Sequence, residues 1–357
     1  MSDSLVSDGG VADSPVADSV VFVSCADSGE LHVLHLAAAT GQLRTGQVLQ
    51  LGGQLMPMAL SPDRTRLYVA RRSDPLAVVT LEVDAVAGRA YLLTEAPLPA
   101  SMAHLATDDT GSWLLAASYG GDMVSVQSVD ADGAVRPETA DTHTYATGRH
   151  AHCVLTTPGN RFVLAASLGG GHLHRYQLNA TTGVLVPTDP PVFEMPPGTG
   201  PRHLCFNTRG DRVYVLGELD GFVHVLSFDG DSGELNLLQS LPTLPPDFGG
   251  GAWGADLHLS PDGRWLYTSE RNSHTLAGFA VGAFDGLLRL VGHWPTQQQP
   301  RGFAITGDGR YLVSAGQASH RVGVHAISPE TGALTLVGEH AVGQNPNWVT
   351  ILPLRQN

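Results

Sequence analysis

Short runs of aliphatic, β-branched and aromatic residues recur along this chain at intervals of about 50 residues. Six copies of the run begin at residues 66, 112, 161, 212, 264 and 310, so successive starts are 46 to 52 residues apart. A seventh run at residues 20–24 begins 46 residues before the first of these copies. A fixed long period of this kind is the signature of a repeat architecture, in which each unit forms one supersecondary element.

Each run is flanked by further short apolar segments that are separated by turn residues. The segment Ser260-Pro261-Asp262-Gly263 precedes one run, and the alternating residues 223–226 follow another. Gly accepts a positive φ and Pro presets the first residue of a turn, so these segments predict tight connections between strands. Four short strands in a unit of roughly 50 residues are typical of a propeller blade.

The two ends of the chain predict how the ring closes. Residues 346–352 have the pattern of a first strand with no second strand after it, whereas residues 20–24 supply a second strand with no first. We therefore predict an all-β fold, a seven-bladed β-propeller of four-stranded blades, closed by the N- and C-terminal strands in one composite blade. A β-solenoid or two β-sandwiches are the alternatives. Residues 1–19 lack any period and are predicted to form a flexible extension, and residues 20–357 the propeller domain.

Composition excludes several classes of function. All 20 basic residues of the 357 are Arg, so chemistry through a lysine nucleophile or Schiff base is excluded. The formal net charge of −14 repels nucleic acid and anionic membranes. No apolar run is long enough to span a membrane and the N-terminus lacks a secretory pattern, so we expect a cytoplasmic protein. We expect a monomer or a weak homo-oligomer, with free thiols at the three cysteines.

Ionisable residues gather at two equivalent places in the repeat. In a propeller the first strand of each blade lines the central channel, so matching residues of different blades come together in space. Such residues stand where the first strands begin and where the second strands end: His152, Arg202, Asp256 and Arg301 at the former, and Arg72, Glu218, Arg271 and the polar Gln317 at the latter. A lone charge at a strand end is most simply a solvated rim charge, but several on one channel favour a shared site.

Two histidine pairs raise the question of a metal site. His150 and His152, and likewise His172 and His174, are two residues apart, which would put both rings of a pair on one face of a strand. No third ligand is suitably spaced near either pair, so we predict no metal and no other cofactor. The chain also lacks the motifs of phosphate loops, dinucleotide sites and nucleophile elbows.

Several segments resemble the propeller-type 6-phosphogluconolactonases of bacteria, in order and spacing from residue 20 onward. They are residues 200–203 (Gly-Pro-Arg-His), 217–219, 255–264, 299–303 and 342–346. The family includes lactonases that act on sugar-acid lactones in carbohydrate metabolism and the pentose phosphate pathway, and fungal carboxymuconate cyclases share its fold. The resemblance implies a functional trio of His152, Arg202 and Glu218, with Arg271 and Arg301 as anion contacts. The chain departs from the family at Gly217, Ser167 and Met56, where many members have Asn, Asp and Gln.

Opening a lactone requires an attacking water, a base to take its proton, and a positive group near the carbonyl oxygen. His152 or Glu218 can be the base and Arg202 the stabilising charge; we favour His152, because an ordinary imidazole is mostly neutral at pH 7. We therefore predict a hydrolase that opens 6-phosphogluconolactone or a related aldonolactone. The predicted substrate contacts are Arg271, Arg301, His150, His203, Asp256, Arg72 and Gln317. A muconate-type cycloisomerase or a non-catalytic scaffold are the alternative functions.

Overall fold

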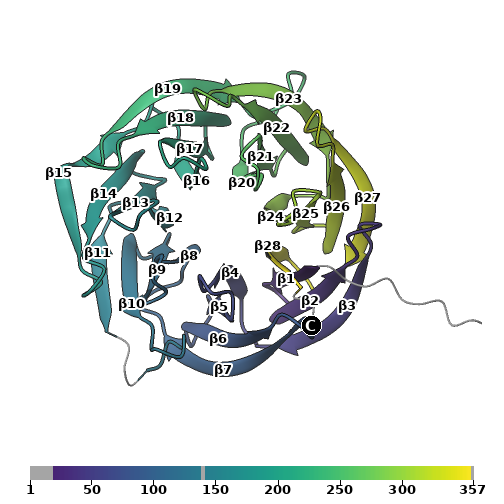
Figure 1. Ribbon diagram of the computed structural model, residues 1–357, viewed down its shortest axis with the longest axis horizontal. Coiled ribbons are helices and arrows are strands. Elements are labelled where there is room, and N and C mark those ends of the chain that lie inside the picture. Colours follow the sequence, from purple (N-terminus) through teal and green to yellow (C-terminus); the bar gives the residue numbers. More distant parts are fainter. Residues whose placement is uncertain (1–18, 138–140, 355–357) are drawn as a thin grey trace, which may run out of the picture.

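The computed structural model describes residues 19–137 and 141–354, which form seven four-stranded sheets arranged in a ring (Figure 1). All neighbouring strands within a sheet are antiparallel, and the described residues contain no helix, hence none that could span a membrane. The predicted seven-bladed β-propeller is therefore confirmed.

The chain termini meet in one composite blade, as predicted. Its strand order, from the channel outward, is β28 (Pro346–Pro353), β1 (Ser19–Cys25), β2 (Glu30–Leu36) and β3 (Leu43–Gln50). Pairing between β1 and β28 runs from Ser19 opposite Pro353 to Ser24 opposite Trp348. The first strand thus begins at Ser19, one residue before the expected domain start; residues 1–18 of the expected extension lie outside the described residues.

The other six blades each consist of four strands that are consecutive in the chain. The strands, with the innermost of each blade first, are β4 (Leu55–Leu60), β5 (Arg66–Arg71), β6 (Ala77–Asp84) and β7 (Arg89–Pro97); β8 (His104–Thr107), β9 (Trp113–Ser118), β10 (Met123–Ser128) and β11 (Thr142–Ala146); β12 (Ala151–Thr156), β13 (Phe162–Ser167), β14 (His172–Leu178) and β15 (Leu185–Glu194); β16 (Pro201–Phe206), β17 (Arg212–Gly217), β18 (Phe222–Phe228) and β19 (Leu235–Pro242); β20 (Gly254–Leu259), β21 (Trp265–Glu270), β22 (Thr275–Val281) and β23 (Leu288–Pro295); and β24 (Pro300–Ile305), β25 (Tyr311–Gly316), β26 (Arg321–Ile327) and β27 (Leu334–Ala341). Figure 1 shows the first strand of every blade facing the centre.

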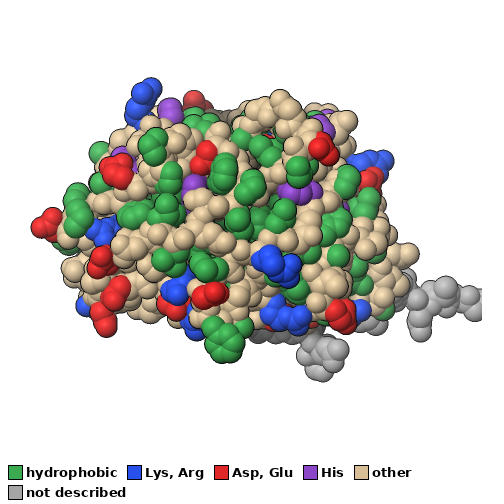
Figure 2. Space-filling model, turned by 90° about the horizontal axis from the view of Figure 1, so that it is seen from above, with side chains coloured by type: hydrophobic (Ala, Val, Ile, Leu, Met, Phe, Trp, Pro, Cys, Tyr) green, Lys and Arg blue, Asp and Glu red, His purple; other side chains and the backbone are tan. Residues whose placement is uncertain are grey.

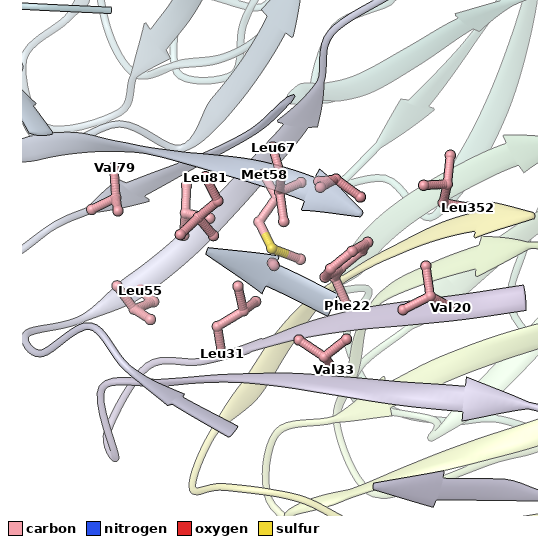
Figure 3. Close-up of a cluster of buried hydrophobic side chains, with 13 residues drawn as sticks. Val20, Phe22, Leu31, Val33, Leu55, Met58, Leu67, Val79, Leu81 and Leu352 are labelled. Atoms are coloured by element: carbon pink, nitrogen blue, oxygen red, sulfur yellow. The ribbon is translucent and has the colours of Figure 1, made fainter. Parts of the chain in front are cut away.

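The hydrophobic core lies between neighbouring blades, which explains why the second strands read as continuous apolar runs. Successive side chains of a strand point to opposite faces of its sheet. Phe22 of β1 accordingly packs with Leu67 and Val79 of the next blade (Figure 3), whereas Val21 and Val23 pack with the β24–β27 blade on the other side. Both faces of each blade are buried, so each blade depends on its two neighbours.

Candidate active site at one mouth of the channel

Most innermost strands, though not β8, contain a register shift near their first residues that decides which side chains reach the channel. In β12, Ala151 pairs with Ser167 and Cys153 with Ala166, which leaves His152 as an extra residue without a partner. Arg202 is the extra residue at the same place in β16. Bulges of this kind commonly turn a side chain toward a functional site. We call the end of the channel at which the innermost strands begin the mouth.

In the β16–β19 blade, the residue after the second strand is hydrogen-bonded to the residue before the first strand. Glu218 comes directly after β17, and its backbone N–H donates to the carbonyl of Gly200 over 2.9 Å. Gly200 has a φ of +57°, and a Cβ there would lie 2.6 Å from the Leu219 side chain. Because a side chain at residue 200 would collide with Leu219, glycine at this turn allows Glu218 to lie beside Arg202.

Glu218 is shared by two buried arginines. Its Oε2 accepts a hydrogen bond from Arg202 Nε and another from Arg271 Nη2, each over 2.8 Å. The Arg271 guanidinium also lies 3.9 Å above the ring centre of Trp253. Burial disfavours the carboxylate, but the charges of Arg202 and Arg271 outweigh this and hold the pKa of Glu218 below its usual value of 4.5. Glu218 is therefore ionised and fixes both guanidinium groups.

Two further arginines give the mouth a surplus of positive charge. Arg72 donates from Nε to Ser101 Oγ over 2.8 Å, whereas the Arg301 guanidinium has no hydrogen bond or ion pair with any described residue. Burial, followed by the charges of Arg202 and Arg271, lowers the pKa of Arg301 below 12.5. A guanidinium nevertheless keeps its proton in proteins, so the cluster attracts an anion instead.

The side of the outer wall seen in Figure 2 shows no comparable surplus. On the side seen in Figure 2, Arg and acidic side chains are interspersed near the lower edge. The chain as a whole has a net charge of −14. The positive mouth is thus a local feature of the channel and not the continuation of a basic patch on this side of the wall.

His152 lies in the same mouth as a neutral imidazole. It is 4% exposed, and its ring centre lies 5.1 Å from that of His203 and 6.0 Å from that of Tyr119. Burial, followed by the charge of Arg202, lowers the pKa of His152 well below 6.5. Its Nδ1 is buried without a hydrogen-bond partner, which leaves Nε2 as the nitrogen that can meet a water or a substrate.

A comparison of the sequence with protein families agrees with the seven-bladed ring. Residues 20–351 match the family described as lactonase, 7-bladed beta-propeller. The chain belongs to the lactonase family. The prediction of an enzyme, a lactonase, and the resemblance from which it came are thereby confirmed.

Individual relatives of this lactonase carry related names. The chain is 36% identical to the 6-phosphogluconolactonase of Serratia proteamaculans over 286 residues, which are 80% of this chain and 84% of the relative. The corresponding protein of Pectobacterium carotovorum is 38% identical over the same shares. Among solved structures, the periplasmic gluconolactonase of Pseudomonas aeruginosa matches with a TM-score of 0.86 and 26% identity, over 94% of this chain and 99% of that one.

Two residues expected to contact the substrate lie deeper in the lactonase channel. His203 and Asp256 are 4% and 5% exposed, and His203 Nδ1 donates to Asp256 Oδ1 over 2.7 Å. In β16, His203 follows the extra residue Arg202, whereas in β20 Asp256 lies within the register shift, between Gly254 and Leu257. The structure thus brings them beside Arg202, to which His203 is hydrogen-bonded, as the third residues of β16 and β20.

Gln317 and His150 lie at the rim of the lactonase mouth. Gln317 donates to Asn345 Oδ1 of the composite blade over 2.7 Å. The expectation that His150 and His152 share one strand face is wrong, because β12 begins at Ala151 and His150 lies in the preceding turn with a φ of +63°. The His150 ring instead stacks on Tyr119 at 4.1 Å.

The second histidine pair is placed as expected, with the rings of His172 and His174 adjacent on β14 at 4.7 Å. Among residues 19–137 and 141–354, no three His, Cys, Asp or Glu side chains are grouped so as to hold a metal ion. Sequence reasoning overlooked Trp253 and Tyr119. Trp253 could have been found from the repeat, because it stands two residues before Ala255, just as Gly200 stands two residues before Arg202 in the preceding blade.

Proposed function

We propose that this lactonase opens a sugar-acid lactone, 6-phosphogluconolactone or a related aldonolactone, to the free acid. The observation that carries the proposal is the convergence of Arg202, the ionised Glu218 and the neutral His152 beside the unpaired Arg301. The names of the relatives support the same class of substrate.

Arg202 is the group that stabilises the charge formed during the reaction. A guanidinium has five N–H groups. Arg202 uses Nε for Glu218 and Nη1 for the Ala255 carbonyl and His203 Nε2, whereas Nη2 has no hydrogen-bond partner among the described residues. When water attacks the lactone, the carbonyl oxygen becomes an oxyanion, and Nη2 donates to it. Because Arg202 is already fixed, no reorganisation opposes this step.

His152 is the base. Its Nε2 takes a proton from the attacking water as the new C–O bond forms; the intermediate then collapses, the bond to the ring oxygen breaks, and that oxygen receives the proton back. Glu218 is a weaker candidate, because both Arg202 and Arg271 already hold its charge. Glu218 instead orients Arg202. No covalent bond forms between the enzyme and the substrate.

Arg301 is the anchor for a second oxygen-rich group of the substrate. A planar guanidinium grips a phosphate through two parallel hydrogen bonds. Arg301 has no competing carboxylate, and Arg72 lies close enough to affect its pKa electrostatically. A phosphorylated lactone would therefore gain affinity from Arg301, whereas a plain aldonolactone would use it to hold hydroxyl groups.

The experiment is a panel of lactones offered to the purified protein. Acid release is followed with a pH indicator for 6-phosphogluconolactone and glucono-lactone, each corrected for spontaneous opening in buffer. A muconate followed by ultraviolet absorbance tests the cycloisomerase alternative. Rates indistinguishable from buffer across all lactones would refute the proposal. The cytoplasmic location and the monomeric or weakly oligomeric state stay predictions.

The acidic limb of the pH profile is expected to lie below pH 6.5. Because burial and Arg202 lower the pKa of His152, its neutral, basic form persists as the pH falls below the usual titration range of histidine. The value of kcat/KM for glucono-lactone, which has no titrating phosphate, should therefore stay level between about pH 6.5 and 7.5. A limb with its midpoint at or above pH 6.5 would contradict this, and His152→Gln should remove the limb.

A further inference from the structure

A hydrogen-bonded chain runs beneath Arg202. Arg202 Nη1 lies 3.3 Å from His203 Nε2, and His203 Nδ1 lies 2.7 Å from Asp256 Oδ1. All three residues are at most 5% exposed. The chain therefore joins the candidate oxyanion donor to a carboxylate of the neighbouring blade.

The roles of these atoms follow from their chemistry. A guanidinium can only donate, so His203 Nε2 must accept from Arg202 Nη1. An ionised carboxylate can only accept, so the proton of His203 must be on Nδ1. Burial, followed by the charge of Arg202, lowers the pKa of His203 to about 4, in keeping with a neutral ring.

Asp256 is fixed in turn by its own surroundings. Its Oδ1 also accepts from the backbone N–H of Leu257 over 3.0 Å, and its Oδ2 accepts from that of Phe303 over 3.2 Å. His258 Nε2 lies 3.1 Å from Oδ2. Two histidines and two backbone groups thus hold both oxygens of this carboxylate in place.

We propose that His203 and Asp256 are positioning residues that hold Arg202 for catalysis. Asp256 selects the histidine tautomer, and His203 Nε2 holds Nη1, so that Nη2 alone faces the reacting carbonyl. The catalytic part of this inference rests on the proposed function. Without the acceptor at Nε2, the Ala255 carbonyl is the one remaining partner of Nη1, so the guanidinium is held less firmly beside Glu218 and can lose its alignment.

Variants of His203 test the proposal. His203→Gln places an amide oxygen where Nε2 accepts, whereas His203→Leu removes the acceptor at similar volume. We expect His203→Leu to lower kcat by ~10²-fold with KM little changed, because misplacement of a catalytic group slows the reaction step more than it weakens substrate binding. The His203→Gln variant should retain most of the wild-type kcat. His104→Leu is the matched control, because His104 is also buried, at 8% exposure, and its ring centre lies 5.4 Å from that of His203 without a bond to Arg202.

The outcomes are decisive once circular dichroism and urea unfolding show that the variants fold. A folded His203→Leu with unchanged kcat would overturn the proposal. So would a rise in KM alone, which would show direct substrate contact, or equal losses in the Gln and Leu variants.

A second readout does not depend on activity. Nitrogen NMR of ¹⁵N-histidine-labelled protein, with the His203 signal identified by its absence in His203→Gln, should show a protonated Nδ1 and an unprotonated Nε2 that does not titrate above pH 5. An Nε2–H tautomer would overturn the positioning chain. If the Nδ1–H tautomer is found in a protein without lactonase activity, the proposed function fails, and the catalytic role of His203 fails with it.

Discussion

Replacing Arg202 with Ala is expected to lower kcat for lactone opening by ~10²–10³-fold, the usual cost of losing one preorganised oxyanion donor. The physical reason is that Nη2 interacts with charge that develops only in the transition state. KM should therefore change much less than kcat. Stopped-flow or steady-state measurement of acid release, corrected for the buffer rate, gives both constants.

Two further variants separate this effect from general damage. Arg289→Ala removes an exposed arginine of β23 and should leave kcat unchanged. Arg202→Lys keeps the charge but cannot bond Glu218, His203 and a substrate in one plane, so it should recover little. Breaking a buried ion pair costs ~3–5 kcal/mol of stability, so each variant must first be shown to be folded. Full activity in a folded Arg202→Ala protein would show that Arg202 is not the oxyanion donor.

Deleting residues 346–357, which removes β28, is expected to abolish the cooperative unfolding transition. β28 pairs with β1 along its length, and its Val349 and Leu352 are buried in two different interblade clusters. Burial of one such leucine is worth ~2–5 kcal/mol, and the loss of two buried side chains and a strand approaches the ~5–15 kcal/mol stability of a typical protein. Thermal unfolding followed by circular dichroism measures the change.

A peptide provides the control for this deletion. Residues 344–354 added in trans should bind the exposed edge of β1 and restore a transition, because an extended peptide can complete an open sheet. A scrambled peptide should not. A truncated protein that unfolds cooperatively without any peptide would show that closure by the composite blade does not stabilise the ring.

The fold was predictable because its signals are periodic and long. Turns such as residues 260–263 mark each repeat, and the unpaired strand patterns at the two ends could be satisfied only by one another. The meeting of Arg202, Glu218 and Arg271 followed from the same reasoning, because residues at equivalent blade positions must converge once the ring is closed.

The details that escaped prediction depend on shifts of a single residue. A bulge changes which of two adjacent side chains faces the channel, so no alternation rule could show that His152 projects while His150 stacks on Tyr119 in a turn. The bond between His203 and Asp256 joins the third residues of two innermost strands, 53 positions apart. Its presence depends on rotamers and distances that a sequence pattern does not contain.

A crystal structure with the product acid, 6-phosphogluconate or gluconate, would show whether Arg202 and His152 form the reaction site. We expect the carboxylate within about 3 Å of Arg202 Nη2, beside His152 Nε2. A cavity of about 380 Å³ near the other end of the channel, lined by His104, His258 and Trp348 among others, offers the acid a different place. An acid bound there, or at the rim without contact to Arg202, would refute the proposed roles of Arg202 and His152.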